Sequence, residues 1–87
     1  MSKGFDELLT FPTLFIFRII AKDRENILED CKAALTHVFD SIQAVESIPS
    51  RTGRFTRIHI GVMAMDSNQL YKGYEVLKEI DGIRMVF

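Results

Sequence analysis

Two hydrophobic periods alternate along this chain of 87 residues, and their order restricts the fold more than any other feature. Residues 11–21, 41–50, 54–64 and 83–87 are rich in aromatic and β-branched residues or alternate apolar with polar side chains, as β-strands do. Residues 24–40 and 67–81 instead carry apolar residues at the spacing of an amphipathic helix. The order is therefore β-α-β-β-α-β.

This order predicts an α+β fold, a ferredoxin-like βαββαβ sandwich with an antiparallel sheet in the order 4-1-3-2 and two helices on one face. Residues 11–21 and 54–64 are the most apolar and are expected in the centre of the sheet, whereas 41–50, which ends at Pro49, is typical of an edge strand. The helices are expected to cover the following side chains: Phe15, Phe17, Ile19, Ile58, Ile60, Val62, Ile83, Met85 and Phe87.

The ends of the helices also have sequence signals. Asp23 is the expected N-cap of the first helix, and Asp66, or Ser67 beside it, that of the second. Gly82 is expected to end the second helix in the left-handed conformation. Gly73, in the middle of that helix, costs about 1 kcal/mol relative to Ala, which indicates close packing on the sheet.

Residues 11–87 are predicted to form a single domain, and residues 1–10 either dock on it as a turn or fray. The hydrophobic fraction of 47% predicts a folded chain. The net charge of −1 lacks the basic excess of a dedicated nucleic-acid binder. A single cysteine excludes an intrachain disulfide, and no apolar run approaches the roughly 18 residues of a membrane-spanning helix. We therefore expect a cytoplasmic protein without a membrane partner.

Three stretches stand out beyond these periods: Leu8-Leu9-Thr10-Phe11-Pro12-Thr13 with Phe15 and Phe17, Pro49-Ser50-Arg51-Thr52-Gly53-Arg54-Phe55, and Ile80-Asp81-Gly82-Ile83-Arg84-Met85-Val86-Phe87. They resemble the opening strand, the Ser-Ser-Lys-Gly-x-Tyr turn and the Val-Arg-Met-Val-Leu terminus of the YbeD-like family of small bacterial proteins of unknown function. The resemblance spans nearly the whole chain. It implies a ferredoxin-like fold similar to the amino-acid-binding regulatory (ACT) domains of metabolic enzymes, and it supplies no catalytic residues.

The turn departs from the family pattern. Arg51 and Thr52 stand where the family has Ser-Lys, and Phe55 replaces Tyr. A role of the family's lysine therefore does not carry over to this chain.

The residue types that carry catalysis or bind metals are sparse. Cys31 lies on the apolar stripe of the first predicted helix, where a buried core residue is the expected role. His37 and His59 are far apart in the sequence and form no zinc spacing with the cysteine. The carboxylates fall mostly on helix faces or caps, and no glycine-rich phosphate loop occurs. We predict no catalytic residue, no metal site and no cofactor.

One constellation remains, on the sheet face that the helices leave open. Guanidinium and imidazole groups from neighbouring strands and the hairpin could receive an anion there, and they are Arg18, Arg57, His59, Arg84, Arg51 and Arg54. Apolar side chains are predicted on the same face, namely Leu14, Ile16, Ile20, Met63 and Val86. Such a face resembles a contact surface, and the competing interpretation is a set of long polar residues that keeps the sheet soluble.

The sequence thus favours a non-enzymatic regulatory or interaction module. Its open face or an edge strand would bind a partner protein or a small anionic metabolite, and a homo-oligomer is left open. Single-stranded RNA binding is the alternative, but the face offers only Phe55 and His59 for stacking. An acylphosphatase-like hydrolase would need an anion-cradling loop after the first strand, and residues 22–24 hold an aspartate and no glycine.

Overall fold

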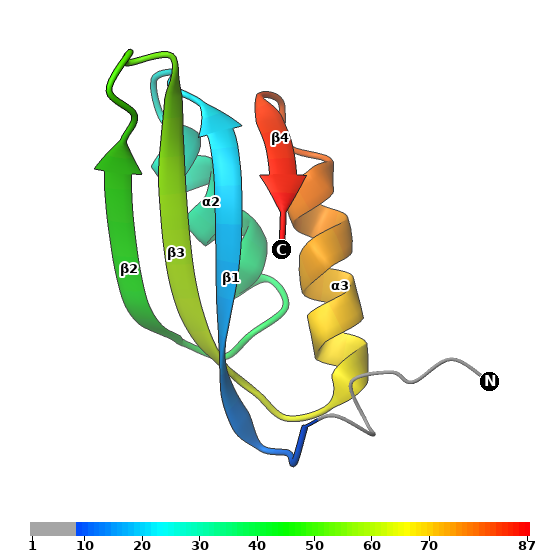
Figure 1. Cartoon of the computed structure of the whole chain (residues 1–87). Coiled ribbons are helices and arrows are strands. Elements are labelled where there is room, and N and C mark those ends of the chain that lie inside the picture. Colours follow the sequence, from blue (N-terminus) through cyan, green and yellow to red (C-terminus); the bar gives the residue numbers. More distant parts are fainter. Residues whose placement is uncertain (1–8) are drawn as a thin grey trace, which may run out of the picture.

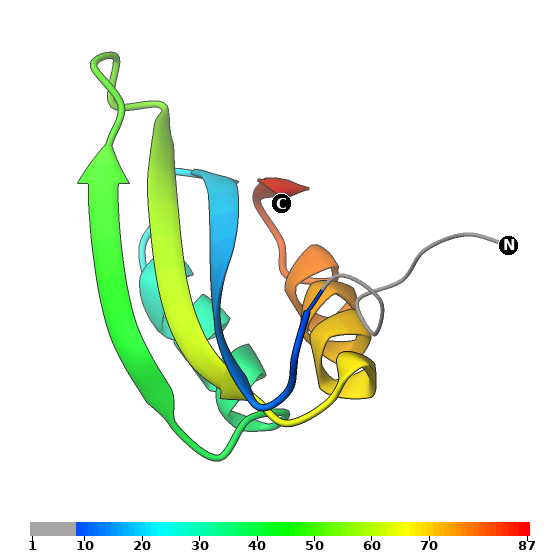
Figure 2. The same cartoon turned by 60° about the horizontal axis from the view of Figure 1, so that its bottom comes forward.

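The computed structural model describes residues 9–87 and confirms the predicted order of elements (Figure 1). The strands are β1 (Thr13–Lys22), β2 (Ile42–Pro49), β3 (Phe55–Ala64) and β4 (Ile83–Val86), and the helices are α2 (Ile27–Thr36) and α3 (Ser67–Lys78). The antiparallel sheet has the order β2-β3-β1-β4, which is the predicted order 4-1-3-2. Both helices lie on one face of it (Figure 2). The predicted behaviour of residues 1–8 lies outside the described residues.

The core lies between the helices and the two central strands. In β1 and β3, Phe17 pairs with Ile60 and Ile19 with Ile58, so their alternate side chains all point toward the helices. The burial of each large apolar side chain stabilises the fold by roughly 1.5–3 kcal/mol. The buried apolar residues are Phe17, Ile19, Ala21, Ile27, Cys31, Leu35, Phe39, Ile58, Ile60, Val62, Ala64, Leu70 and Leu77.

The predicted faces of β4 are wrong after its first residue. Ile83 pairs with Ala21, but Met85 pairs with Ile20, so β4 advances by two residues while β1 advances by one. Arg84 is the extra residue of this β-bulge, which reverses the alternation of the strand. Val86 therefore packs against the core, although it was predicted on the open face. Met85 and Phe87, predicted beneath the helices, are more than half exposed on the opposite side.

The two helix starts differ in how well the sequence predicts them. Asp66 caps α3 as predicted, since its Oδ1 accepts a hydrogen bond of 2.9 Å from the backbone N–H of Gln69. Asp23 does not cap α2, because its backbone N–H still donates to the carbonyl of Arg54 and so continues the strand pairing. The N-cap is Asn26, which has a left-handed φ of 65° and no side-chain cap bond.

Candidate functional site

The sheet face opposite α2 and α3, called here the open face, carries many exposed apolar side chains. Register and alternation place them on one side of the sheet. They are 38% to 54% exposed, and they are Leu14, Ile16, Ile48, Phe55, Met63, Met85 and Phe87. An exposed apolar area of this kind is typical of an interaction site rather than of a surface that contacts water alone.

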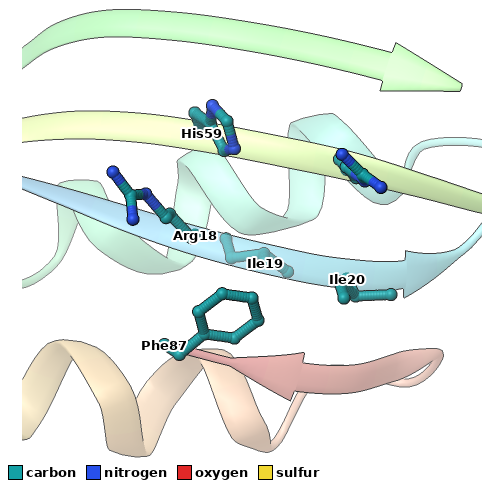
Figure 3. A pocket seen from close by; sticks show the side chains of 6 residues that line it. Arg18, Ile19, Ile20, His59 and Phe87 are labelled. Carbon is teal, nitrogen blue, oxygen red and sulfur yellow. The ribbon is translucent and has the colours of Figure 1, made fainter.

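A polar row crosses the middle of this face. In the strand pairing, Glu46 of β2 is opposite His59 of β3, and His59 is opposite Arg18 of β1. Arg18 in turn exchanges two backbone hydrogen bonds of 2.7 Å with Phe87, just beyond β4. Figure 3 shows the Arg18, His59 and Phe87 side chains on the same side of the sheet, with the helices behind it. Four strands therefore hold one continuous row of side chains.

The charged groups of this row are paired unequally. His59 Nδ1 lies 3.2 Å from Glu46 Oε1, so the imidazole has an acidic partner. Within residues 9–87, the guanidinium groups of Arg18 and Arg57 make no ion pair and no side-chain hydrogen bond. Arg57 is opposite Ile20 in the next row, so Arg18 and Arg57 are diagonal neighbours across β1 and β3. Figure 3 shows the Arg18 side chain extending along β1 away from Ile20.

Two hollows flank the ridge formed by Arg18 and His59. The first, of about 260 Å³, is lined by these two residues with Ile20, Arg57 and Phe87, and also by Ile19 (Figure 3). The second, of about 300 Å³, lies toward β2 above Gly61 and contains Glu46. The first hollow is therefore lined by cations and apolar groups, and the second has a carboxylate at its edge.

The predicted cation cluster is divided by the structure. Arg18, Arg57 and His59 lie together, as the strand alternation predicted. Arg84 lies in the bulge of β4, and Arg51 and Arg54 lie in the exposed β2–β3 turn, so these three line neither hollow. A ligand-binding role for any of the six stays a prediction.

The sequence analysis missed Glu46, Ile48, Met85 and Phe87 as members of this face. The register of the β2–β3 hairpin places Glu46 opposite His59, and the Ser50–Phe55 backbone bond at its turn fixes that register. The hairpin signal could therefore have identified Glu46. Phe87 was assigned to the wrong face because the bulge has no signal in the sequence.

Among residues 9–87, the reactive groups away from the open face include the thiol of Cys31. Cys31 is fully buried, and this burial raises the pKa of its thiol to about 11, so the nucleophilic thiolate is scarce at neutral pH. No group of three or more His, Cys, Asp or Glu side chains within residues 9–87 could hold a metal ion. In the same range, neither helix has the length and apolar character needed to cross a membrane.

Comparison with known sequences identifies related proteins of unknown role. A family model described as "Protein of unknown function (DUF493)" matches residues 6–87. The UPF0250 protein PM1928 of Pasteurella multocida (strain Pm70) is 26% identical over 80 residues, covering 92% of this chain and 91% of the relative. A UPF0250 protein of Haemophilus ducreyi (strain 35000HP / ATCC 700724) is 30% identical over 81 residues, covering 92% and 82%.

Comparison with solved structures supports the fold. Protein HP0495 of H. pylori matches with a TM-score of 0.74 and 11% identity, over 91% of this chain and 85% of that one. The ACT domain from the GTP pyrophosphokinase of Chlorobium tepidum matches with a TM-score of 0.70 and 15% identity, over 85% and 94%. The fold of this chain is thus similar to that of an ACT domain.

Proposed function

The chain belongs to the DUF493 family of proteins of unknown function, and we propose that it is a non-enzymatic regulatory module. In this proposal it binds an acidic partner on its open face. The acidic partner is a protein segment or a small anionic metabolite. The open face binds it through free arginines set among apolar side chains.

The observation that carries this proposal is the pair of guanidiniums, Arg18 and Arg57, without an acidic partner on an apolar face. Arginine forms strong, directional hydrogen bonds with carboxylates and phosphates. When a ligand covers the face, the surrounding apolar area is removed from water and the charged contact becomes stronger. A face with both properties suits an acidic ligand that also has apolar groups.

The charge of the face favours such a ligand over a second copy of the chain. Among the described residues, Glu46 is the Asp or Glu side chain on the open face, and it is already paired with His59. The other described carboxylates lie in α2 and α3 or in the loops that join these helices to the strands. Two copies that met through their open faces would bring arginines of like charge together, which opposes binding.

The fold is similar to that of an ACT domain, and this similarity supports a regulatory role. The sequence identity is 15%, so the support comes from the fold and not from shared residues. The buried thiol and the scattered carboxylates support a module without catalysis. RNA binding is less well supported. On the open face, Phe55 lies at the start of β3 and Phe87 just beyond β4, and the other open-face positions of β1 and β3 hold no Phe, Tyr or Trp on which bases could stack.

The test is a titration of the ¹⁵N-labelled protein, followed by amide shifts, with four separate probes: pooled amino acids, pooled nucleotides, a short single-stranded RNA and an acidic peptide containing leucine. Shifts clustered on β1 and β3 with an acidic probe would support the proposal. Shifts confined to the helices, shifts with RNA alone, or silence with all four probes would overturn it. A dimer formed through the open face, measured by sedimentation, would also overturn it, because a second copy would then occupy the site.

A further inference from the structure

The hollow between β3, β1 and β4 has a more specific chemistry than the rest of the open face. We propose that the hollow lined by Arg18, Ile20, Arg57, His59 and Phe87 binds a single carboxylate carried by a small apolar body of roughly five or six carbons. This inference rests on the proposed function and assigns a ligand class to it.

The polar half of the hollow fits a carboxylate. Arg18 and Arg57 are diagonal neighbours on adjacent antiparallel strands, a separation at which long side chains can converge on one group. A planar guanidinium presents paired N–H donors that match the two oxygens of a carboxylate. Glu46 lies on the β2 side of His59 and does not line this hollow, so no Asp or Glu side chain of the described residues competes for the two arginines there.

The other half of the hollow is apolar and argues against a bare inorganic anion. Phe87, which is 51% exposed, projects its ring from the end of β4 on the same side of the sheet as Arg18 (Figure 3). Ile20 forms the adjoining surface, and Met85 is its neighbour across the strand pair. Phosphate would leave this apolar surface in water, whereas a hydrocarbon group on the ligand would cover it.

The volume limits the size of the ligand. One water molecule occupies about 30 Å³, and a non-hydrogen atom of a ligand with its hydrogens occupies about the same volume. A hollow of 260 Å³ therefore holds roughly eight or nine such atoms. A carboxylate uses three of these, which leaves roughly five or six for the apolar body. The adjacent hollow is of similar size, but Glu46 lies at its edge and repels an anion, so the site is assigned to the first hollow.

The experiment uses hexanoate as the probe, with acetate, hexan-1-ol and inorganic phosphate as matched compounds, and follows the amide shifts of the full chain. Hexanoate should shift Arg18, Arg57 and Phe87, and the other three compounds should bind at least about tenfold more weakly, since each lacks one of the two contacts. Arg57→Gln and Phe87→Ala should each weaken hexanoate binding, by about tenfold for the arginine. Arg54→Gln removes an arginine from the turn and should leave the affinity unchanged.

The outcomes separate this inference from the proposed function. If hexanoate fails while the acidic peptide or another anion still shifts the open face, the ligand class is wrong and the proposed function stands. If phosphate binds as tightly as hexanoate, the apolar half is irrelevant and the inference is overturned. If no acidic probe shifts the open face, both the inference and the proposed function are wrong.

Arg57→Lys retains the charge without the planar guanidinium and should still bind hexanoate more weakly than the native chain. A native amide spectrum of this variant shows that it is folded.

Discussion

At the scale of single residues, Gly73 decides how closely α3 approaches the sheet. A Cβ atom at this position would lie 2.6 Å from Cζ of Phe17 and 3.1 Å from Cε2 of Phe39, and both rings are buried. These rings are 5.9 Å apart between centroids, and Tyr74 packs against Phe17 at 5.0 Å. The aromatic cluster therefore fills the space that any other side chain at position 73 would need.

Gly73→Ala should lower the free energy of unfolding by about 1–3 kcal/mol, as overpacking does, even though alanine favours a helix by about 1 kcal/mol. Urea unfolding followed by circular dichroism measures this difference. Gly61→Ala is the matched control, because a Cβ there would meet Ala44 at 3.5 Å, an ordinary contact, and the change should be within about 1 kcal/mol. An unchanged midpoint for Gly73→Ala would show that α3 can shift at little cost.

At the scale of elements, the sequence predicts the strands and helices better than their exact pairing. The order, the central position of β1 and β3 and the edge position of β2 follow from apolar content and chain connections. The reversal of faces in β4 depends on where Arg84 bulges, and the backbone pairing with β1 determines this rather than the local alternation. The N-cap of α2 was mispredicted for a similar reason, since Asp23 is held by Arg54 on another strand.

The same limit applies to the candidate site. Arg18, Arg57 and His59 follow from simple strand alternation in the two central strands, so they could be predicted. The aromatic wall at Phe87 depends on the bulge, and the partner of His59 depends on the hairpin register. Long-range pairing thus supplies the part of the site that the sequence alone does not predict.

The start of α3 is the element boundary with the most specific contacts. Asp66 caps the helix by accepting a hydrogen bond from the backbone N–H of Gln69. The side chain of Gln69 makes two further hydrogen bonds: its Oε1 accepts one of 2.7 Å from the Met65 N–H, and its Nε2 donates one of 3.1 Å to the Val38 carbonyl. Asp66→Ala should lower the free energy of unfolding by about 0.5–2 kcal/mol. Asp23→Ala, at the position that does not cap α2, should change it by less than about 0.5 kcal/mol. Equal losses in urea unfolding would refute the distinction between the two aspartates.

At the scale of the whole molecule, the acidic side chains are distributed unevenly over the surface. The Asp and Glu side chains of the described residues other than Glu46 lie in the helices or in the loops that join them to the strands, whereas the apolar open face carries Arg18 and Arg57 without acidic partners. The net charge of −1 therefore conceals a local excess of positive charge. This excess has two consequences, because it attracts an acidic ligand and it keeps the apolar faces of two copies apart.

The second consequence can be tested by removing the charge. Arg18→Gln with Arg57→Gln should strengthen self-association by at least about tenfold, because the apolar area remains while the repulsion between copies is lost. Sedimentation equilibrium over a range of protein concentrations measures this. Arg51→Gln with Arg54→Gln removes the same charge from the β2–β3 turn and should behave as the native chain does. In 1 M salt, where the screening length is about 3 Å, the native chain should approach the behaviour of the first variant. Equal association by the two double variants would mean that net charge, rather than the position of the arginines on the open face, keeps the copies apart.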